Sequence, residues 1–194
     1  MIDIFDLLKN AFNIAKGMDD SGDSDREMHR IRSQNLVDEL ARGFQRHYED
    51  NPMVRVFWAR NNKNQSSFNL KELLYDITVC EVDETPSATG RALMSFVTKT
   101  HWIIESEFER NSRAAIVDMS KLVLGQSENV LFIGPSVGPK EGYMDMLGNV
   151  ARRCIGRVYL AIIEHSSRWK THLSSPELYL WDGDAWSQEK FSTS

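Results

Sequence analysis

The sequence predicts an α/β protein whose mixed central sheet is flanked by helices. Its 194 residues are 41% hydrophobic and 26% charged, a composition that allows one sizeable core. Short β-branched and aromatic runs alternate with amphipathic segments along the chain. The predicted order of elements in the body is α-β-β-β-α-β-α-β, and helical crossovers between the later strands imply parallel pairing.

The N-terminal segment, residues 1–18, is predicted to form an amphipathic helix. Its apolar positions recur at helical spacing and are Ile4, Leu7, Leu8, Ala11, Ile14 and Ala15. Residues 19–30 contain the run DDSGDSD and are predicted to form a flexible acidic linker. We expect the tethered helix to dock on the body or on a second copy of the chain, with binding to a partner protein as the alternative.

The body is predicted to span residues 31–173. It begins with an amphipathic helix that stops at Asn51-Pro52, because proline cannot continue the helical hydrogen bonds. Five strands are predicted, over residues 53–59, 73–82, 101–108, 129–133 and 158–163. Two further helices are predicted, over residues 111–124 and 143–154.

Two segments complete the predicted organisation. Residues 85–99 fit either a helix or extended chain. The tail, residues 174–194, is predicted to form a small hairpin around Asp182-Gly183.

Composition excludes several classes of protein. No stretch approaches the roughly 20 apolar residues that span a membrane, so no membrane contact is expected. The N-terminus lacks the pattern of a signal peptide, and a cytoplasmic location is therefore expected. The net charge of −5 argues against nonspecific binding to polyanions.

Positive charge is nevertheless concentrated in one part of the sequence. Five cations between residues 148 and 173 are predicted to contact nucleic-acid phosphates: Arg152, Arg153, Arg157, Arg168 and Lys170. The alternative is that they form a solvated basic face.

Asp76, Glu105 and Glu107 form the pattern with the most chemical content. Strand side chains alternate, so Glu105 and Glu107 point to the same face, whereas Asp76 interrupts an otherwise apolar strand. Burying an acid is costly unless it is paired or bound to a cation. Three convergent carboxylates are therefore expected to form a site for Mg²⁺ or Mn²⁺. The alternative is that the glutamates line an exposed strand and Asp76 is a turn or cap residue.

The order of elements, with acids on the second and third strands of a meander, resembles the restriction-endonuclease-like (PD-(D/E)xK) nuclease superfamily over residues 34–165. Tyr75-Asp76-Ile77 is similar to its first acidic motif, and Glu105-Ser106-Glu107 is similar to its (D/E)xK motif. The resemblance implies a metal-dependent nuclease or a nuclease-like DNA-binding protein, with Asp76 and Glu105 holding the metal. Glu39 matches an acid that the superfamily often carries in the first helix, although a solvated helix glutamate is the favoured interpretation.

The sequence departs from this motif at Glu107, where the superfamily pattern has lysine. A few restriction enzymes of the superfamily are similar in carrying glutamate there. Alternatively, the lysine has moved to the following helix. A helix that returns alongside the strand, with a rise of ~1.5 Å against ~3.3 Å per residue, reaches the level of Glu105 near Lys121. Glu107 is then expected to orient or deprotonate water, and Lys121 to stabilise phosphate charge, unless Lys121 is a surface lysine.

Two other functions fit the sequence. One is a catalytically inactive module of the same fold that acts in protein assembly, which the acidic net charge, the missing lysine and the tethered helix favour. The other is an acidic chaperone-like α+β dimer, which requires a wholly antiparallel sheet.

The histidines lack metal-ligand spacing, and the glycine-rich loop at 134–140 lacks the P-loop pattern.

Overall fold

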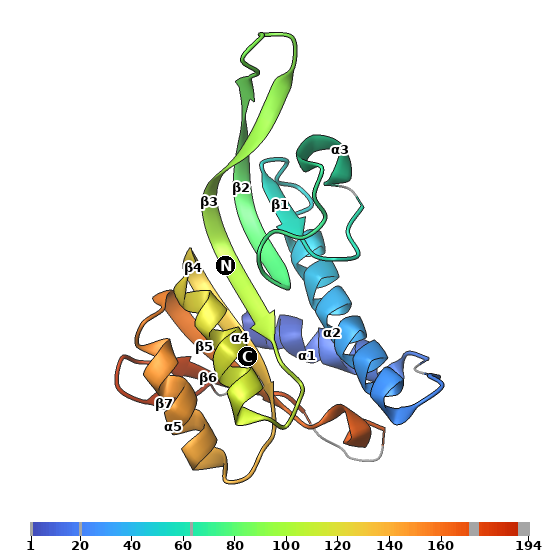
Figure 1. The fold of residues 1–194 in the computed structure, drawn as a ribbon, viewed down its shortest axis with the longest axis vertical. Coiled ribbons are helices and arrows are strands. Elements are labelled where there is room, and N and C mark those ends of the chain that lie inside the picture. Colours follow the sequence, from blue (N-terminus) through green and yellow to red (C-terminus); the bar gives the residue numbers. More distant parts are fainter. Residues whose placement is uncertain (1, 20, 63, 171–174, 190–194) are drawn as a thin grey trace.

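The computed structural model describes residues 2–19, 21–62, 64–170 and 175–189. These residues form three layers, with a seven-stranded mixed sheet between two pairs of helices (Figure 1). The predicted α/β class, with its central mixed sheet and flanking helices, is therefore confirmed.

The helices of the described residues are α1 (Ile4–Gly17), α2 (Asp25–His47), α3 (Gln65–Phe68), α4 (Ser112–Val123), α5 (Lys140–Ala151) and the 3₁₀ helix η1 (Ser166–Arg168). The strands are β1 (Val54–Phe57), β2 (Ile77–Pro86), β3 (Leu93–Ser106), β4 (Gln126–Pro135), β5 (Ile155–Ile163), β6 (Glu177–Trp181) and β7 (Trp186–Gln188). The predicted elements are present with shifted ends, and α3 lies between the first two strands, where no helix was predicted.

The strands occur in the sheet in the order of the chain, from β1 to β7. The first three form an antiparallel meander, whereas β3, β4 and β5 are parallel and are connected by α4 and α5. The final two strands are antiparallel additions at the edge. This parallel pairing disagrees with the wholly antiparallel sheet that the chaperone-like alternative requires.

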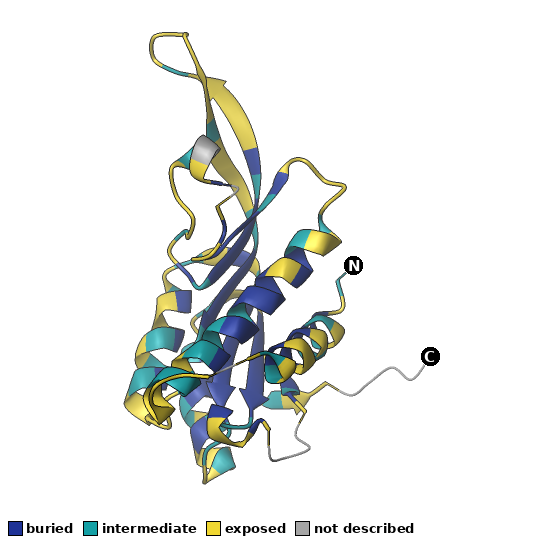
Figure 2. Ribbon diagram, turned by 90° about the vertical axis from the view of Figure 1, so that its right-hand side faces the viewer, coloured by how far each residue is buried: buried dark blue, intermediate teal, exposed yellow. Residues whose placement is uncertain are grey.

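The central part of the sheet is buried on both faces (Figure 2). Helices α1 and α2 pack on one face, and α4 and α5 pack on the other. Residues 130–133 of β4 are fully buried, as expected for an apolar strand covered on both sides.

Helix α1 docks on the body of the same chain. Its buried residues are Ile4, Leu8, Ala11, Phe12 and Ala15. The ring of Phe12 packs edge-on against Trp169, with 5.0 Å between the ring centroids. Four of the six residues of the predicted apolar stripe are therefore buried within the chain, whereas Ile14 is exposed, and the structure gives no support to a dimer or partner bound through this helix.

The segment between α1 and α2 is shorter than the linker predicted over 19–30. Helix α2 begins at Asp25, and the Ser24 side chain accepts a hydrogen bond from the Glu27 backbone N–H. Acidic side chains near a helix N-terminus interact favourably with the helix dipole. The acids that suggested a linker therefore belong in part to the start of a helix.

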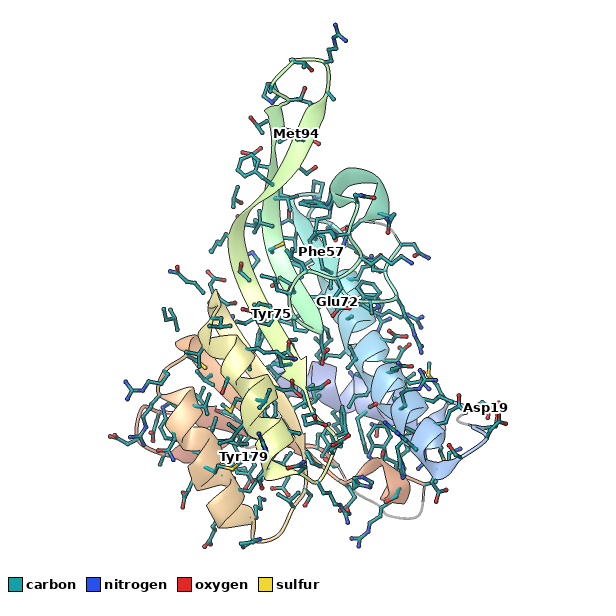
Figure 3. All side chains as sticks on the ribbon, viewed as in Figure 1. Asp19, Phe57, Glu72, Tyr75, Met94 and Tyr179 are labelled. Carbon is teal, nitrogen blue, oxygen red and sulfur yellow. The ribbon has the colours of Figure 1, made fainter. Side chains whose placement is uncertain are left out.

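Strands β2 and β3 form a long hairpin that projects from the body (Figure 1). Residues 93–99, which fitted either a helix or extended chain, are the first half of β3. Neighbouring strands pair only with the inner part of the hairpin, so its outer part is exposed. Exposed apolar side chains there include Leu93, Met94 and Phe96. Figure 3 labels Met94 on this outer part of the hairpin.

The predicted C-terminal hairpin is present as β6 and β7, with Gly183 at positive φ in the connection. Residues 171–174 and 190–194, at the ends of the predicted body and tail, lie outside the described residues. No helix in the described part of the chain has the length and apolar character needed to cross a membrane.

Candidate functional site

Asp76 and Glu105 lie beside each other at one edge of the sheet. Asp76 directly precedes β2, and the antiparallel pair Ile77–Ile104 makes Glu105 its cross-strand neighbour. Glu105 is only 3% exposed. Its burial, together with the charge of Asp76, raises the pKa of Glu105 to about 7. The structure thus brings these two predicted residues together.

Ser106, the middle residue of the predicted motif, fixes the carboxylate of Asp76. Its backbone N–H and its hydroxyl both donate to Oδ2 of Asp76, at 2.9 and 2.6 Å. Burial raises the pKa of Asp76, and these two hydrogen bonds oppose that shift. Ser106 was not predicted as a site residue, because a serine between two glutamates carries no signal of its own.

Lys121 reaches the same site from α4. Its Nζ lies 3.1 Å from Oε2 of Glu105 and 2.7 Å from Oδ1 of Asp118. The hydrogen bond to Asp118 is the main cause of a raised Lys121 pKa, and Glu105 contributes further. The prediction that Lys121 lies level with Glu105, made from the rise per residue of a helix and a strand, is therefore correct. Asp118 was missed, although its position three residues before Lys121 places both on one helix face.

Glu107 lies just beyond β3 and is half-buried. Its Oε1 accepts a hydrogen bond of 2.7 Å from the backbone N–H of Glu109. Burial raises the pKa of Glu107, and the nearby Asp118 carboxyl adds to this shift. Asp118 thus interacts both with Glu107 and with Lys121, and it links Glu107 to the Glu105–Lys121 pair.

The expected cluster of three carboxylates is reduced to a pair. Within the described ranges, no three His, Cys, Asp or Glu side chains are grouped closely enough to hold a metal ion. Asp76 and Glu105 each have a second oxygen that accepts no hydrogen bond from the described residues. Mg²⁺ is often bound by one or two carboxylates, completed by water and phosphate oxygens, so the oxygen donors of this pair are of the type that Mg²⁺ uses.

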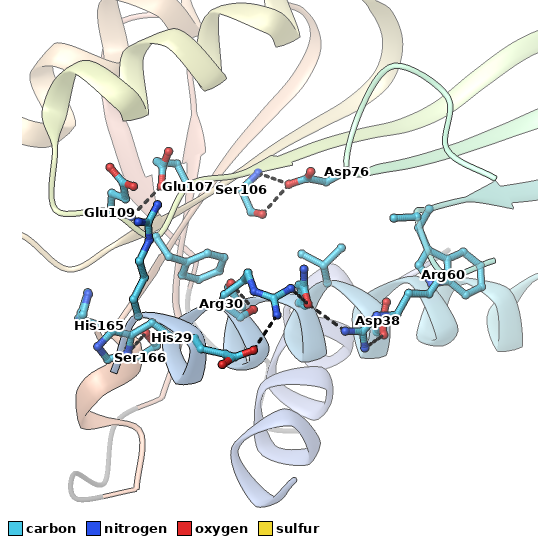
Figure 4. Close-up of a pocket in the computed structure, with 18 of the residues that line it drawn as sticks. His29, Arg30, Asp38, Arg60, Asp76, Ser106, Glu107, Glu109, His165 and Ser166 are labelled. Atoms are coloured by element: carbon cyan, nitrogen blue, oxygen red, sulfur yellow. Dashed lines mark hydrogen bonds and ion pairs between the residues drawn. The ribbon is translucent and has the colours of Figure 1, made fainter. Parts of the chain in front are cut away.

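A cleft of about 960 Å³ separates the ends of β2 and β3 from α2 (Figure 4). The strand side of the cleft carries four acids: Glu72, Asp76, Glu107 and Glu109. The opposite side carries three arginines: Arg26, Arg30 and Arg60. Sequence analysis missed these arginines, because they come from two segments that only the fold brings together.

Glu39 belongs to α2, whereas Asp76 and Glu105 lie at the ends of β2 and β3. It is buried and ion-paired with Arg42 at 2.6 Å, and like Glu105 it is not among the residues that line the cleft. Its neighbour Asp38 does line the cleft and contacts Arg60 at 2.6 Å. Successive helix residues point in different directions, so α2 presents Asp38 rather than Glu39.

Three of the five predicted phosphate-binding cations lie away from the carboxylates. Strand pairing places Arg157 level with Trp102, three residues or about 10 Å before Glu105 along the parallel strands. Arg152 and Arg153 precede Arg157 and lie at the amino edge of those strands. These three arginines therefore do not flank the carboxylate pair.

The other two predicted cations follow β5 at the opposite, carboxyl edge. Arg168 belongs to η1 and forms an ion pair of 3.5 Å with Glu164. Lys170 follows η1 and is exposed. Only this end of the predicted basic segment lies on the same edge of the sheet as Glu105.

Comparison of the chain with known protein families, with curated proteins and with solved structures finds no significant match.

Proposed function

We propose that this protein is a divalent-metal-dependent phosphodiesterase that cleaves nucleic acid, with DNA as the favoured substrate. The observation that carries the proposal is the contact of Glu105 with Lys121 beside Asp76. These three residues come from different elements, and sequence reasoning selected each of them for this chemistry.

We further propose that the fold is restriction-endonuclease-like. In support, an antiparallel meander of β1, β2 and β3 is followed by a helical crossover to β4, which is parallel to β3. Helix α2 precedes this unit and packs on the face opposite α4. Asp76 and Glu105 occupy the ends of the second and third strands, where the resemblance expects the acidic motifs.

The proposed mechanism assigns a task to each side chain. Asp76 and Glu105 would hold the cation through their second oxygens. When bound, Mg²⁺ or Mn²⁺ would polarise the scissile phosphate and lower the pKa of a water molecule. Glu107 would accept the proton of the attacking water, a task that its raised pKa suits. The Lys121 ammonium group would donate to the phosphate oxygen on which negative charge develops.

The arginines across the cleft would hold the substrate strand. Arg30 is well exposed, and its contacts with Glu27 and Gln34 are both long, at 3.4 Å. Such contacts are weak, so Arg30 can turn towards a phosphate at small cost. Arg26 lines the same side of the cleft one helical turn earlier.

The proposal is tested with Asp76→Asn and Glu105→Gln. Neutralising either acid relieves repulsion within the site, so each variant should keep or exceed the wild-type melting temperature in EDTA. Each should lose the stabilisation by Mg²⁺ and reduce the rate of DNA cleavage by about 100-fold or more. Thermal unfolding with and without Mg²⁺ and a cleavage assay on labelled DNA and RNA measure these effects.

Glu84→Gln is the matched control, because Glu84 is an exposed acid on the outer part of the same hairpin. It should respond to Mg²⁺ and cleave as the wild type does. An equal Mg²⁺ response in all variants would show that no cation is held by Asp76 and Glu105.

A second candidate is the catalytically inactive module of this fold, which acts in protein assembly. The exposed apolar side chains of the projecting hairpin, Leu93, Met94 and Phe96, favour it. Absence of cleavage of both DNA and RNA with Mg²⁺ and Mn²⁺ would support this candidate over the phosphodiesterase.

A further inference from the structure

We propose a separate phosphate-binding site, formed by Arg110, Lys140 and Arg168, beside the candidate catalytic residues. Its assignment to a nucleic-acid phosphate rests on the proposed function, whereas phosphate binding itself requires no cleavage. The three cations line one cavity of about 540 Å³. They come from three separate parts of the chain: the segment after β3, the first turn of α5, and η1.

The cavity carries an excess of positive charge. Glu164 is the one acid among its lining residues, and its contact with Arg168 is long, at 3.5 Å. Lys140 forms an ion pair with Glu177, and its Nζ lies 5.0 Å from the centre of the Tyr179 ring. Arg110 has no hydrogen bond or ion pair with any of the described residues. Because Lys140 is paired with Glu177 and Arg168 with Glu164, Arg110 supplies the excess positive charge that a bound anion would offset.

The start of α5 adds backbone donors to this site. Gly138 and Lys140 line the cavity, and the N-cap residue Pro139 supplies no side-chain hydrogen bond. The first N–H groups of a helix have no partner within the helix, and together with the helix dipole they favour an anion. This contribution supports the three side chains and does not define the site without them.

The site adjoins the candidate catalytic residues. The parallel strands β3, β4 and β5 end at one edge of the sheet, with Glu107 and Arg110 after β3 and Arg168 after β5. Two strand spacings, about 10 Å, separate the ends of β3 and β5. His165 lines the main cleft, and its pKa is lowered by burial and then by the charge of Arg110. The site is therefore placed to hold a phosphate that neighbours the scissile one.

The first experiment measures binding of inorganic phosphate without metal. Thermal unfolding is followed for the wild type, for Arg110→Ala/Arg168→Ala and for the control Arg152→Ala/Arg153→Ala, at equal ionic strength with chloride or phosphate. The wild type and the control should melt about 5–10 °C higher when phosphate is at 100 times its Kd. The Arg110/Arg168 variant should lose this shift, apart from a general salt effect common to all three proteins.

The control removes two arginines that lie at the opposite edge of the sheet. Arg110→Lys/Arg168→Lys keeps the charges and should restore most of the phosphate shift, which separates a binding role from a structural one. Equal phosphate shifts in the wild type, the alanine variant and the control would overturn the proposal.

The second experiment identifies the source of the phosphate. Single-stranded DNA with a 5′-phosphate or a 5′-hydroxyl is titrated in Ca²⁺ at several salt concentrations. A terminal phosphate predicts about tenfold tighter binding of the phosphorylated strand, which the Arg110/Arg168 variant loses. A backbone phosphate predicts equal binding of both strands, with a salt slope that falls by about 0.7 per lost contact in that variant.

Binding of a terminal phosphate and binding of a backbone phosphate both support the proposed phosphate site. A salt slope that falls only in the Arg152/Arg153 control overturns it. Asp76→Asn should keep the shift with inorganic phosphate while it loses cleavage. If the wild type binds phosphate but does not cleave, the proposed function fails and the phosphate site stands.

Discussion

Glu105 combines burial with two charged neighbours of opposite sign. Burial and the charge of Asp76 favour its protonated form, whereas Lys121, 3.1 Å away, favours the ionised form. Because the first two effects are larger, the pKa of Glu105 rises to about 7. In the absence of metal this carboxyl therefore changes charge near neutral pH, unlike an exposed glutamate.

The raised pKa predicts how stability depends on pH. The folded-state pKa of about 7 lies above the ordinary value of 4.5, so the folded protein binds the proton more tightly than the unfolded chain does. The stabilisation of the folded state by the protonated Glu105 carboxyl is complete below pH 4.5. It is lost as the pH rises through 7, and the free energy of unfolding falls by up to about 3 kcal/mol. Glu105→Gln should avoid this loss.

Urea unfolding in EDTA at pH 5 and pH 8 measures the effect. The free energy of unfolding of Glu105→Gln, relative to that of the wild type, should be higher at pH 8 than at pH 5. The exposed control Glu84→Gln should follow the wild type at both. A constant difference between Glu105→Gln and the wild type would show that Glu105 does not titrate in this range.

At the scale of elements, α1 shows how a segment that looks tethered becomes part of the core. One face of the helix is apolar, and α2 begins at Asp25, only a few residues after α1 ends at Gly17. Docking on the body buries that face without the entropy cost of association with a second molecule.

A pair of substitutions on α1 tests this packing. Phe12 is fully buried against Trp169, so Phe12→Ala should reduce the free energy of unfolding by about 3–5 kcal/mol. Ile14 on the same helix is 43% exposed, and Ile14→Ala should change it by about 0.5 kcal/mol or less. Chemical denaturation measures both values. A similar small effect for the two variants would indicate that α1 does not dock as described.

At the scale of the whole molecule, the sheet joins all the elements into one unit. Its two faces contribute to separate hydrophobic clusters, and strands β3, β4 and β5 have side chains in both. The five tryptophans are spread over the fold, at Trp58, Trp102, Trp169, Trp181 and Trp186. Loss of either cluster therefore removes the packing on one face of the same strands.

This arrangement predicts a single cooperative unfolding transition. Tryptophan fluorescence and far-UV circular dichroism should give the same midpoint in urea, because the N-terminal helix packs on the sheet and the C-terminal hairpin is part of it. Separate transitions by the two probes would instead indicate that residues 1–18 or 174–194 unfold independently of the body.

The sequence by itself determined the elements and identified the central residues of the candidate site. Local periodicity and capping act within a few residues, so the helices, the strands and the apolar stripe of α1 were predictable. Asp76 and Glu105 were recognisable because acids in apolar strands need a partner. Lys121 followed from the fixed rise of helix and strand.

Only the tertiary structure decided which distant segments meet. It placed Arg30 of α2 opposite Asp76, directed Asp38 rather than Glu39 towards the cleft, and left Arg152 at the far edge. It also gathered Arg110, Lys140 and Arg168 around one cavity. Each position depends on strand order and on the rotation of a helix about its axis. Strand order and helix rotation are set by the burial of apolar surface summed over the whole chain, so they cannot be predicted from a local sequence pattern.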